Sequence, residues 1–280
     1  MSFHNRRNWA VAVSSMFAAT LAACSAPSAP LRDGDGPGIV SLNPCTDAIL
    51  VEVADPGQIL AISHFSRDPA SSSIDPATAR RFKATSGTVE EVAALNPDLV
   101  LAGAFLPPAT TAALTDLGFR TETFGIAGEV EQSFAQVRRI AALAGHPDRG
   151  EALIGRIERA LVDSVPRPDA TPIGTVLWQP GEIVPGEQTM IGTLMRHAGF
   201  SSHSAALGLG QADYLSLEQV LANPPDLLLV AGNSRGQQHP ALAKLHYTRI
   251  EPLDPALLYC GGPTIARALD RLVEIRDEAE

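Results

Sequence analysis

The sequence has no Lys/Arg-rich run, no histidines spaced as His-x-His, and few cysteines. Its 31 acidic residues outnumber 21 basic ones, giving a formal net charge of −10, which argues against nucleic acid as a partner. The seven histidines are scattered, so no His-rich metal loop is present. Three cysteines are too few for a disulfide scaffold or a cysteine zinc cluster.

Long apolar runs are also missing after the N-terminal segment. Residues 9–23 are almost wholly apolar or small and follow Arg6 and Arg7, a pattern typical of an export signal over residues 1–23. This run is too short to span a bilayer comfortably. No later stretch is long and apolar enough to do so, and we expect a soluble body with no spanning helix.

The apolar run ends in Leu21-Ala22-Ala23-Cys24, which resembles the bacterial lipobox, in which the cysteine is acylated and becomes the new N-terminus. Residues 24–38 are rich in Ser, Ala, Pro, Asp and Gly and are predicted to form a tether. We therefore expect a periplasmic protein held on a bacterial membrane only by a lipid on Cys24. An ordinary signal peptide with a nearby free cysteine is the alternative.

One sequence unit occurs twice, at Glu90–Ala102 and at Glu218–Val230. Aligned on their first residues, the copies keep a valine, a proline, an aspartate and a leucine in step. Pro97 and Pro225 end a short predicted helix in each copy, and the apolar run that follows fits a buried strand of a parallel sheet. The duplication predicts two similar α/β lobes.

Strands alternate with helices on both sides of each repeat, which predicts parallel sheets with right-handed crossovers. The predicted fold is α/β, with two Rossmann-like lobes at residues 39–128 and 169–280. Two amphipathic helices within residues 129–168 form a long rigid connector between them, or simply pack on the sheet of one lobe. Further strands are expected at 39–42, 58–63, 120–124, 174–179 and 249–253.

Ligands of parallel α/β sheets sit beyond the carboxyl ends of the strands. In the first lobe these ends carry residues 43–46, 64–67 and 103–105. In the second lobe they carry Trp178, Asn233, Arg235, Tyr259 and Cys260.

By these features the chain resembles the iron-chelate and vitamin B12 class of substrate-binding proteins of ABC importers, from Ile39 to about Ile275. The resemblance implies two α/β lobes joined by one rigid helix, with the ligand held between them and little hinge motion. It implies a protein without catalytic activity that captures a ferric siderophore, cobalamin or haem-like ligand and delivers it to a permease dimer with its ATPase subunits. It rests on Ile39-Val40-Ser41-Leu42-Asn43-Pro44, Thr88–Val100, Leu217-Glu218-Gln219-Val220 and the closing Gly262-Pro263 helix.

In that class a glutamate at the tip of each lobe docks into arginine pockets of the permease, and the matching residues here are Glu90 and Glu218. Vitamin B12 binders of this type line the cleft with several tryptophans, whereas only Trp178 is available here. The candidate ligand-binding residues are Cys45, His64, Phe65, Arg67, Phe105, Trp178, Tyr214, Asn233, Arg235, Tyr259 and Cys260.

The roles of several of these candidates stay open. Among them, the aromatic residues offer apolar walls. The three cationic candidates His64, Arg67 and Arg235 either meet an anionic chelate or are exposed loop residues. By the resemblance, Cys45 and Cys260 face the cleft from opposite lobes. Three roles are open for this pair: soft ligands of a metal, a disulfide across the cleft, or buried apolar thiols.

Three rival functions remain. Gly232-Asn233-Ser234-Arg235-Gly236 matches the G-x-S-x-G motif of serine hydrolases and follows a strand. No apolar helix follows it, however, and the order serine, acid, histidine is missing, which disfavours a hydrolase. A free transition-metal binder of an ABC importer would need converging histidines and carboxylates. A protein that only scaffolds other envelope proteins would need no cleft chemistry.

Overall fold

A computed structural model describes residues 36–278 of the chain. The predicted signal peptide, the predicted lipidation site Cys24 and most of the predicted tether lie outside these residues. Gly38, the last residue of the predicted tether, is buried, and its N–H donates to the Asp98 carboxylate across 2.7 Å. Gly38 is therefore already part of the folded first lobe. No helix within residues 36–278 has the length and hydrophobicity needed to cross a membrane.

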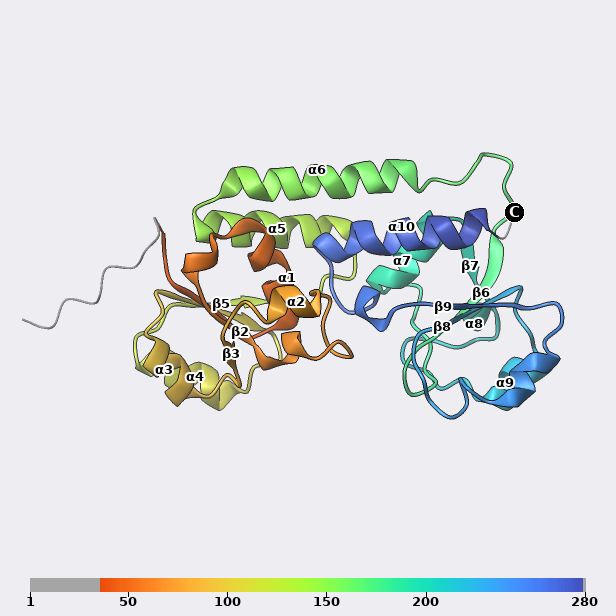
Figure 1. Cartoon of the computed structure of the whole chain (residues 1–280), viewed down its shortest axis with the longest axis horizontal. Helices are drawn as coiled ribbons and strands as arrows, with labels where there is room; N and C mark the ends of the chain where they lie inside the picture. Colours follow the sequence, from red (N-terminus) through yellow and green to blue (C-terminus); the bar gives the residue numbers. More distant parts are fainter. Residues whose placement is uncertain (1–35, 279–280) are drawn as a thin grey trace, which may run out of the picture. The chain divides into compact units, whose positions relative to one another are not determined.

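The first sheet is parallel and has the strand order β3-β2-β1-β4-β5. Successive residues of a strand face opposite sides. Ile39 and Leu99 therefore meet helices α1 and α5 on one face, while Val40 and Val100 meet α3 and α4 on the other (Figure 1). The elements are β1 (Ile39–Ser41), α1 (Pro44–Val53), η1 (Pro56–Gln58), β2 (Ile59–Ser63), η2 (His64–Arg67), α2 (Pro76–Ala79), β3 (Ala84–Thr85), α3 (Val89–Leu95), β4 (Leu99–Gly103), α4 (Pro108–Asp116) and β5 (Thr121–Phe124).

The second sheet is also parallel and has the order β7-β6-β8-β9. Leu177 and Leu229 face helices α7 and α10, whereas Val176 and Leu228 face α9 and η3. The elements are β6 (Ile173–Trp178), α7 (Met190–His197), β7 (Phe200–Ser202), α8 (His203–Ala206), α9 (Leu217–Ala222), β8 (Leu227–Val230), η3 (Pro240–Lys244), β9 (Arg249–Pro252), η4 (Pro255–Leu257) and α10 (Pro263–Asp277).

The two sheets share one topology. Apart from the extra edge strand β3, the strands of each sheet lie side by side in the order second, first, third, fourth, counted along the chain. The repeated unit gives α3 and β4 in the first sheet and α9 and β8 in the second. Thr88 and Ser216 cap the two helices in the same way, each accepting a hydrogen bond from a backbone N–H three residues on. The predicted duplication is thus present in the fold.

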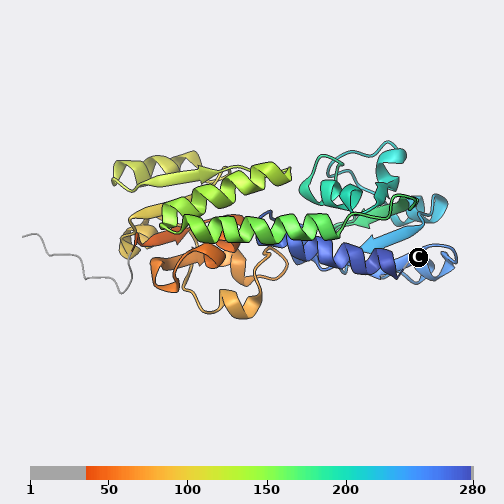
Figure 2. The same cartoon turned by 90° about the horizontal axis from the view of Figure 1, so that it is seen from above.

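Two helices lie between the sheets in the chain, α5 (Val130–Ala144) and α6 (Pro147–Asp163). Gly145 ends α5 in the left-handed region with φ 84°. Helix α6 packs on α5 and α1 and also on α10, so it contacts elements of both lobes (Figures 1 and 2). One hydrophobic core includes Leu101 of the first sheet, Ile157 of α6 and Leu229 of the second sheet. The two lobes are therefore joined through a continuous apolar interior.

Besides the 3₁₀ helices η1, η3 and η4, four short elements were not expected from the sequence, namely α2, β3, β7 and α8. They contain two to four residues each. Such lengths are too short for a hydrophobic period to show. β3 extends the first sheet beyond β2, and β7 is the edge strand of the second sheet at the position that β2 holds in the first.

Candidate functional site

Three adjoining hollows lie where strands of both sheets end, with volumes of about 300, 70 and 750 Å³. The hollow of the first lobe shares Asn43 and Phe105 with the small central one. The central hollow shares Tyr259 with the large one, which carries Pro69 of the first lobe and Asn233 of the second. We refer to the three together as the cleft. Its position matches the strand-end site expected from the sequence.

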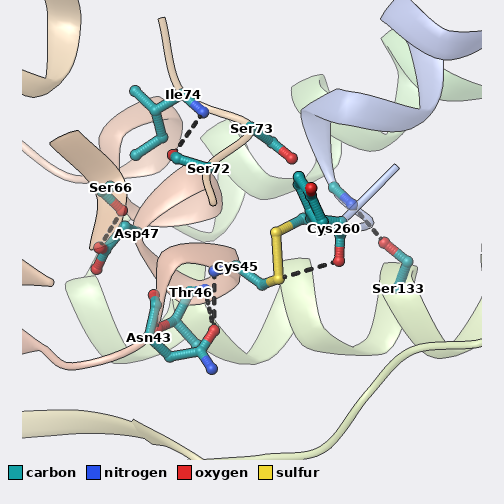
Figure 3. Close-up of a disulfide and its surroundings, with 12 residues drawn as sticks. Asn43, Cys45, Thr46, Asp47, Ser66, Ser72, Ser73, Ile74, Ser133 and Cys260 are labelled. Carbon is teal, nitrogen blue, oxygen red and sulfur yellow. Dashed lines mark hydrogen bonds between the residues drawn. A yellow bond between two sulfur atoms is a disulfide. The ribbon is translucent and has the colours of Figure 1, made fainter. Parts of the chain in front are cut away.

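A disulfide joins Cys45 and Cys260 in the lining of the central hollow, with the two Cα atoms 5.1 Å apart (Figure 3). Cys45 lies in the first turn of α1, where its N–H donates to the side chain of the capping Asn43 across 2.8 Å. On the other side, the N–H of Gly262 donates to Ser133 Oγ of α5 across 2.7 Å. Of the three roles left open for this pair, the structure shows the disulfide. In this state neither sulfur is a free thiolate for a metal.

Asp47 lies buried beneath the first-lobe side of the cleft. Its Oδ2 accepts hydrogen bonds from Ser63 N across 2.9 Å and from Ser66 Oγ across 2.6 Å. Its Oδ1 has no hydrogen-bond partner among the described residues. Burial raises the pKa of this carboxyl to about 7, against the lowering effect of its hydrogen bonds. Asp47 thereby holds η2, the turn that carries Phe65 into the cleft.

Large apolar side chains stand exposed on the first-lobe side. Phe65 is 50% exposed, Phe105 81% and Ile126 76%, and all three line the cleft. Each follows the carboxyl end of a strand, β2, β4 or β5. Exposed apolar groups gathered in this way are typical of a ligand-binding surface.

Tyr259 faces the cleft between the central and large hollows. Burial raises the pKa of its phenol, and the nearby charges of Asp68 and Asp254 raise it further. The phenol therefore keeps its proton at neutral pH and serves as a neutral hydrogen-bond donor. Asn233 adds a carboxamide to the large hollow.

Glu182 organises the loops at the rim of the second lobe. Its Oε1 accepts hydrogen bonds from Ser234 Oγ across 3.1 Å and Gly236 N across 3.0 Å, and its Oε2 accepts one from Tyr214 Oη across 2.9 Å. Glu182 has φ 64°, a conformation that side-chain-bearing residues adopt only when their surroundings hold them there. Ser234 is thus bound to a carboxylate rather than to a histidine, which agrees with the sequence argument against a hydrolase.

The structure brings together six of the predicted ligand-binding residues. The disulfide pair Cys45 and Cys260 lies in the cleft lining. The other four are Phe65, Phe105, Asn233 and Tyr259.

The expectation that Trp178 forms an aromatic wall is not met. The residue is 0% exposed and belongs to the core beneath the second sheet, where its indole N–H donates to Leu215 O across 2.9 Å. As the last residue of β6, its side chain points to a face of the sheet and not past the strand end.

Four other candidates lie outside the cleft lining. His64 packs against Phe65 with ring centroids 4.0 Å apart. Arg67 donates to Phe82 O, Tyr214 is bound to Glu182, and Arg235 is an exposed residue of the loop after β8.

Ile126 and Gln136 are among the residues lining the central hollow that sequence reasoning missed. Ile126 follows β5 and is flanked by Gly125 and Ala127. An apolar residue between two small residues, just past a strand end, was the feature that could have indicated it. Gln136 is on α5, and its Nε2 donates to Gly125 O across 2.8 Å. No feature of the sequence singled it out from other polar helix residues.

A separate hollow of about 450 Å³ lies against α7, β7 and α8 of the second lobe. Its lining takes no residue from the first lobe and shares none with the three hollows of the cleft. It is therefore not part of the cleft. In the part of the chain that the structure covers, no three His, Cys, Asp or Glu side chains are grouped so as to hold a metal ion.

The model of the periplasmic binding protein family matches residues 39–245, the greater part of the chain. This chain belongs to the periplasmic binding protein family. Members of the family are binding proteins. No curated protein sequence matches the chain significantly.

Solved structures of periplasmic binding proteins share the fold. The haem-binding protein RhuT from Roseiflexus sp. RS-1 superposes with a TM-score of 0.71 at 22% identity, covering 88% of this chain and 100% of RhuT. The vitamin B12-binding protein BtuF of Vibrio cholerae superposes with a TM-score of 0.67 at 17% identity, covering 87% of this chain and 98% of BtuF. The haem-binding protein HutB of Vibrio cholerae superposes with a TM-score of 0.68 at 16% identity, covering 85% of this chain and 98% of HutB. At these identities the likeness shows the two-lobed fold.

Proposed function

We propose that this protein is the substrate-binding component of an ABC importer, and that it captures a metal chelate in the cleft between lobes at residues 39–128 and 169–280. The observation that carries the proposal is the cleft itself, a continuous surface of exposed aromatic and apolar groups where strands of both sheets end. The family match and the haem and vitamin B12 binders of the same fold support a ferric siderophore, cobalamin or haem-like ligand.

Ligand capture is tested on protein purified from its own host by absorption spectroscopy and native mass spectrometry. We expect a bound chelate at one per chain, visible in both measurements, and a rise in melting temperature when the chelate is added back. Phe105→Ala should weaken binding, because this side chain offers much apolar contact. Tyr247→Ala is the matched control, since Tyr247 is 100% exposed and precedes β9, at the opposite edge of the sheet. Equal affinity of the two variants would place the ligand elsewhere.

We further propose that Glu90 and Glu218 dock the protein onto the permease. Both are exposed in the first turn of equivalent helices, α3 and α9, so two permease subunits can meet them with like cationic surfaces. Glu90→Arg plus Glu218→Arg should fold and bind ligand normally, yet fail to stimulate the transporter ATPase.

The matched control for docking is Glu158→Arg plus Asp163→Arg, an equal charge change on exposed residues of α6. We expect this control to stimulate the ATPase like the parent. Normal stimulation by the Glu90 and Glu218 double variant would refute the docking assignment. Loss of ligand affinity in it would instead assign these glutamates to the site.

The lipid anchor is the last part of the proposal and rests on the lipobox-like sequence before Cys24. Cys24→Ala should give a protein that is unacylated and released from membranes in a fractionation experiment. A variant that stays in the membrane fraction would contradict the anchor without affecting the cleft.

A further inference from the structure

The lining of the cleft is almost free of formal charge. Among the residues around its three hollows, only Asp254 and Arg271 are charged. Asp254 Oδ1 accepts a hydrogen bond from Ala256 N across 2.9 Å. Arg271 donates to Glu274 Oε2 across 3.1 Å, and another of its nitrogens lies 3.7 Å from Glu251 Oε2. Asp254 is an acid, and the positive charge of Arg271 is already paired with carboxylates, so the lining offers a ligand no unpaired positive charge.

The cations near the cleft are engaged or stand outside its lining. The guanidinium groups of Arg67 and Arg267 donate to the backbone oxygens of Phe82 and Ser73. Arg235 is exposed on its loop and lines none of the three hollows. The one cation in the lining is Arg271, which already lies beside Glu274 and Glu251, so an anion bound in the cleft would leave water without contact with an unpaired cation, which is costly.

Two carboxylates lie close to Tyr259: Asp254 lines the large hollow together with it, and Asp68 directly precedes Pro69 of the same lining. The charges of Asp68 and Asp254 act on the Tyr259 phenol in the direction that opposes a further negative charge. The Asp68 carboxylate is fixed by hydrogen bonds from Ala70 N across 3.0 Å and Ser71 Oγ across 2.9 Å. A ligand carboxylate or phenolate placed beside Tyr259 would be repelled by both aspartates.

The other residues of the cleft lining are either apolar or polar without a charge. Phe65, Phe105 and Ile126 supply apolar surface, while Asn43 and Asn233 supply carboxamides that donate and accept hydrogen bonds. We propose that the cleft selects metal chelates that carry no ionised acidic groups, held by aromatic contact and by hydrogen bonds to neutral amides and a phenol. This inference rests on the proposed function and narrows its ligand to uncharged chelates.

The test uses two pairs of probes. The members of the first pair differ in charge and little else, and those of the second differ in charge and in their chelating groups. Haemin carries two ionised carboxylates, and its dimethyl ester carries none. A ferric trihydroxamate is uncharged, and a ferric tris-catecholate is strongly anionic. Isothermal titration at low salt should show the member without ionised acidic groups binding at least about tenfold more tightly in each pair. The ratio should shrink at high salt, because mobile ions screen the repulsion.

A double variant ties the selectivity to the two aspartates. Asp68→Asn plus Asp254→Asn keeps the side-chain oxygens that accept from Ala70 N and Ala256 N, so both turns should fold as before. The haemin-to-ester ratio should fall toward one in this variant. Haemin binding as tightly as its ester in the parent protein, or an unchanged ratio in the double variant, would overturn the inference. If no probe of any charge binds, the proposed function itself falls, and the inference with it.

Discussion

Asp98 accepts a hydrogen bond from the backbone N–H of Gly38 across 2.7 Å, which ties the turn of the first repeat to the start of β1. The second repeat does the same with Asp226, which accepts from Gly174 N at the start of β6 across 3.1 Å. The aspartate that both repeats share in sequence thus has one structural task. It aligns the third strand of each sheet beside the first.

We expect Asp98→Ala to lower the free energy of unfolding by about 1 kcal/mol, because the Gly38 N–H loses its acceptor. Asp98→Asn keeps an oxygen at the same place and should cost less. Asp226→Ala should cost less than Asp98→Ala, since its bond is longer and more exposed. Urea denaturation of the three variants checks this order, and an unchanged midpoint for Asp98→Ala would contradict it.

The disulfide should stabilise the protein strongly. Cys45 and Cys260 are 215 residues apart, so the bond closes a long loop in the unfolded chain. We expect reduction, or Cys45→Ser plus Cys260→Ser, to lower the free energy of unfolding by about 2–5 kcal/mol. Thermal unfolding with and without a reductant measures the effect. The double variant is the control, because its melting temperature should no longer respond to the reductant.

Stability should fall with rising pH because of Asp47. Its folded pKa of about 7 lies above its ordinary value, so between roughly pH 4 and 7 the folded protein holds a proton that the unfolded chain has released. The contribution of Asp47 to the free energy of unfolding is complete below this window. It is lost as the pH rises through the window, by at most about 1.4 kcal/mol per pH unit. Asp47→Asn cannot ionise and should lack this slope. Parallel stability curves for parent and variant would show that Asp47 does not titrate in this range.

Glu182 should control the ionisation of Tyr214. The hydrogen bond to Glu182 raises the pKa of this phenol, and burial and the Glu182 charge raise it further. Glu182→Gln keeps an acceptor oxygen but removes the charge, so the pKa should move back toward its ordinary value. Ultraviolet titration of tyrosine ionisation detects the change, with Tyr214→Phe identifying the transition. Glu187→Gln, a change at an exposed neighbour, should leave the titration as it is.

The sequence was sufficient to predict the architecture because its signals are long or repeated. The duplicated helix and strand, the prolines that end each helix, and the amphipathic connector each span many residues. The place of the cleft followed from the order of the strands, since the carboxyl ends of parallel strands meet at one edge.

The individual side chains were harder to predict, because their direction depends on details that the pattern does not carry. Trp178 is still within β6, so its ring packs under the sheet, whereas Phe105 and Asn233 lie past a strand end and reach the cleft. Arg67 was expected near the ligand, but Phe82, just before the unpredicted β3, supplies a carbonyl that binds it. Contacts of this kind arise between segments whose approach is known only from the fold.

The apolar interior shared by both sheets and α6 makes the protein a single cooperative unit of unfolding. Neither half keeps a complete interior when the other melts, because Ile157 of α6 and Leu269 of α10 belong to the same cluster. Both lobes should therefore be lost in one calorimetric transition. In protein whose Cys45–Cys260 disulfide has been reduced, a protease cut in the segment between α6 and β6 should leave two fragments that remain associated until the whole molecule denatures.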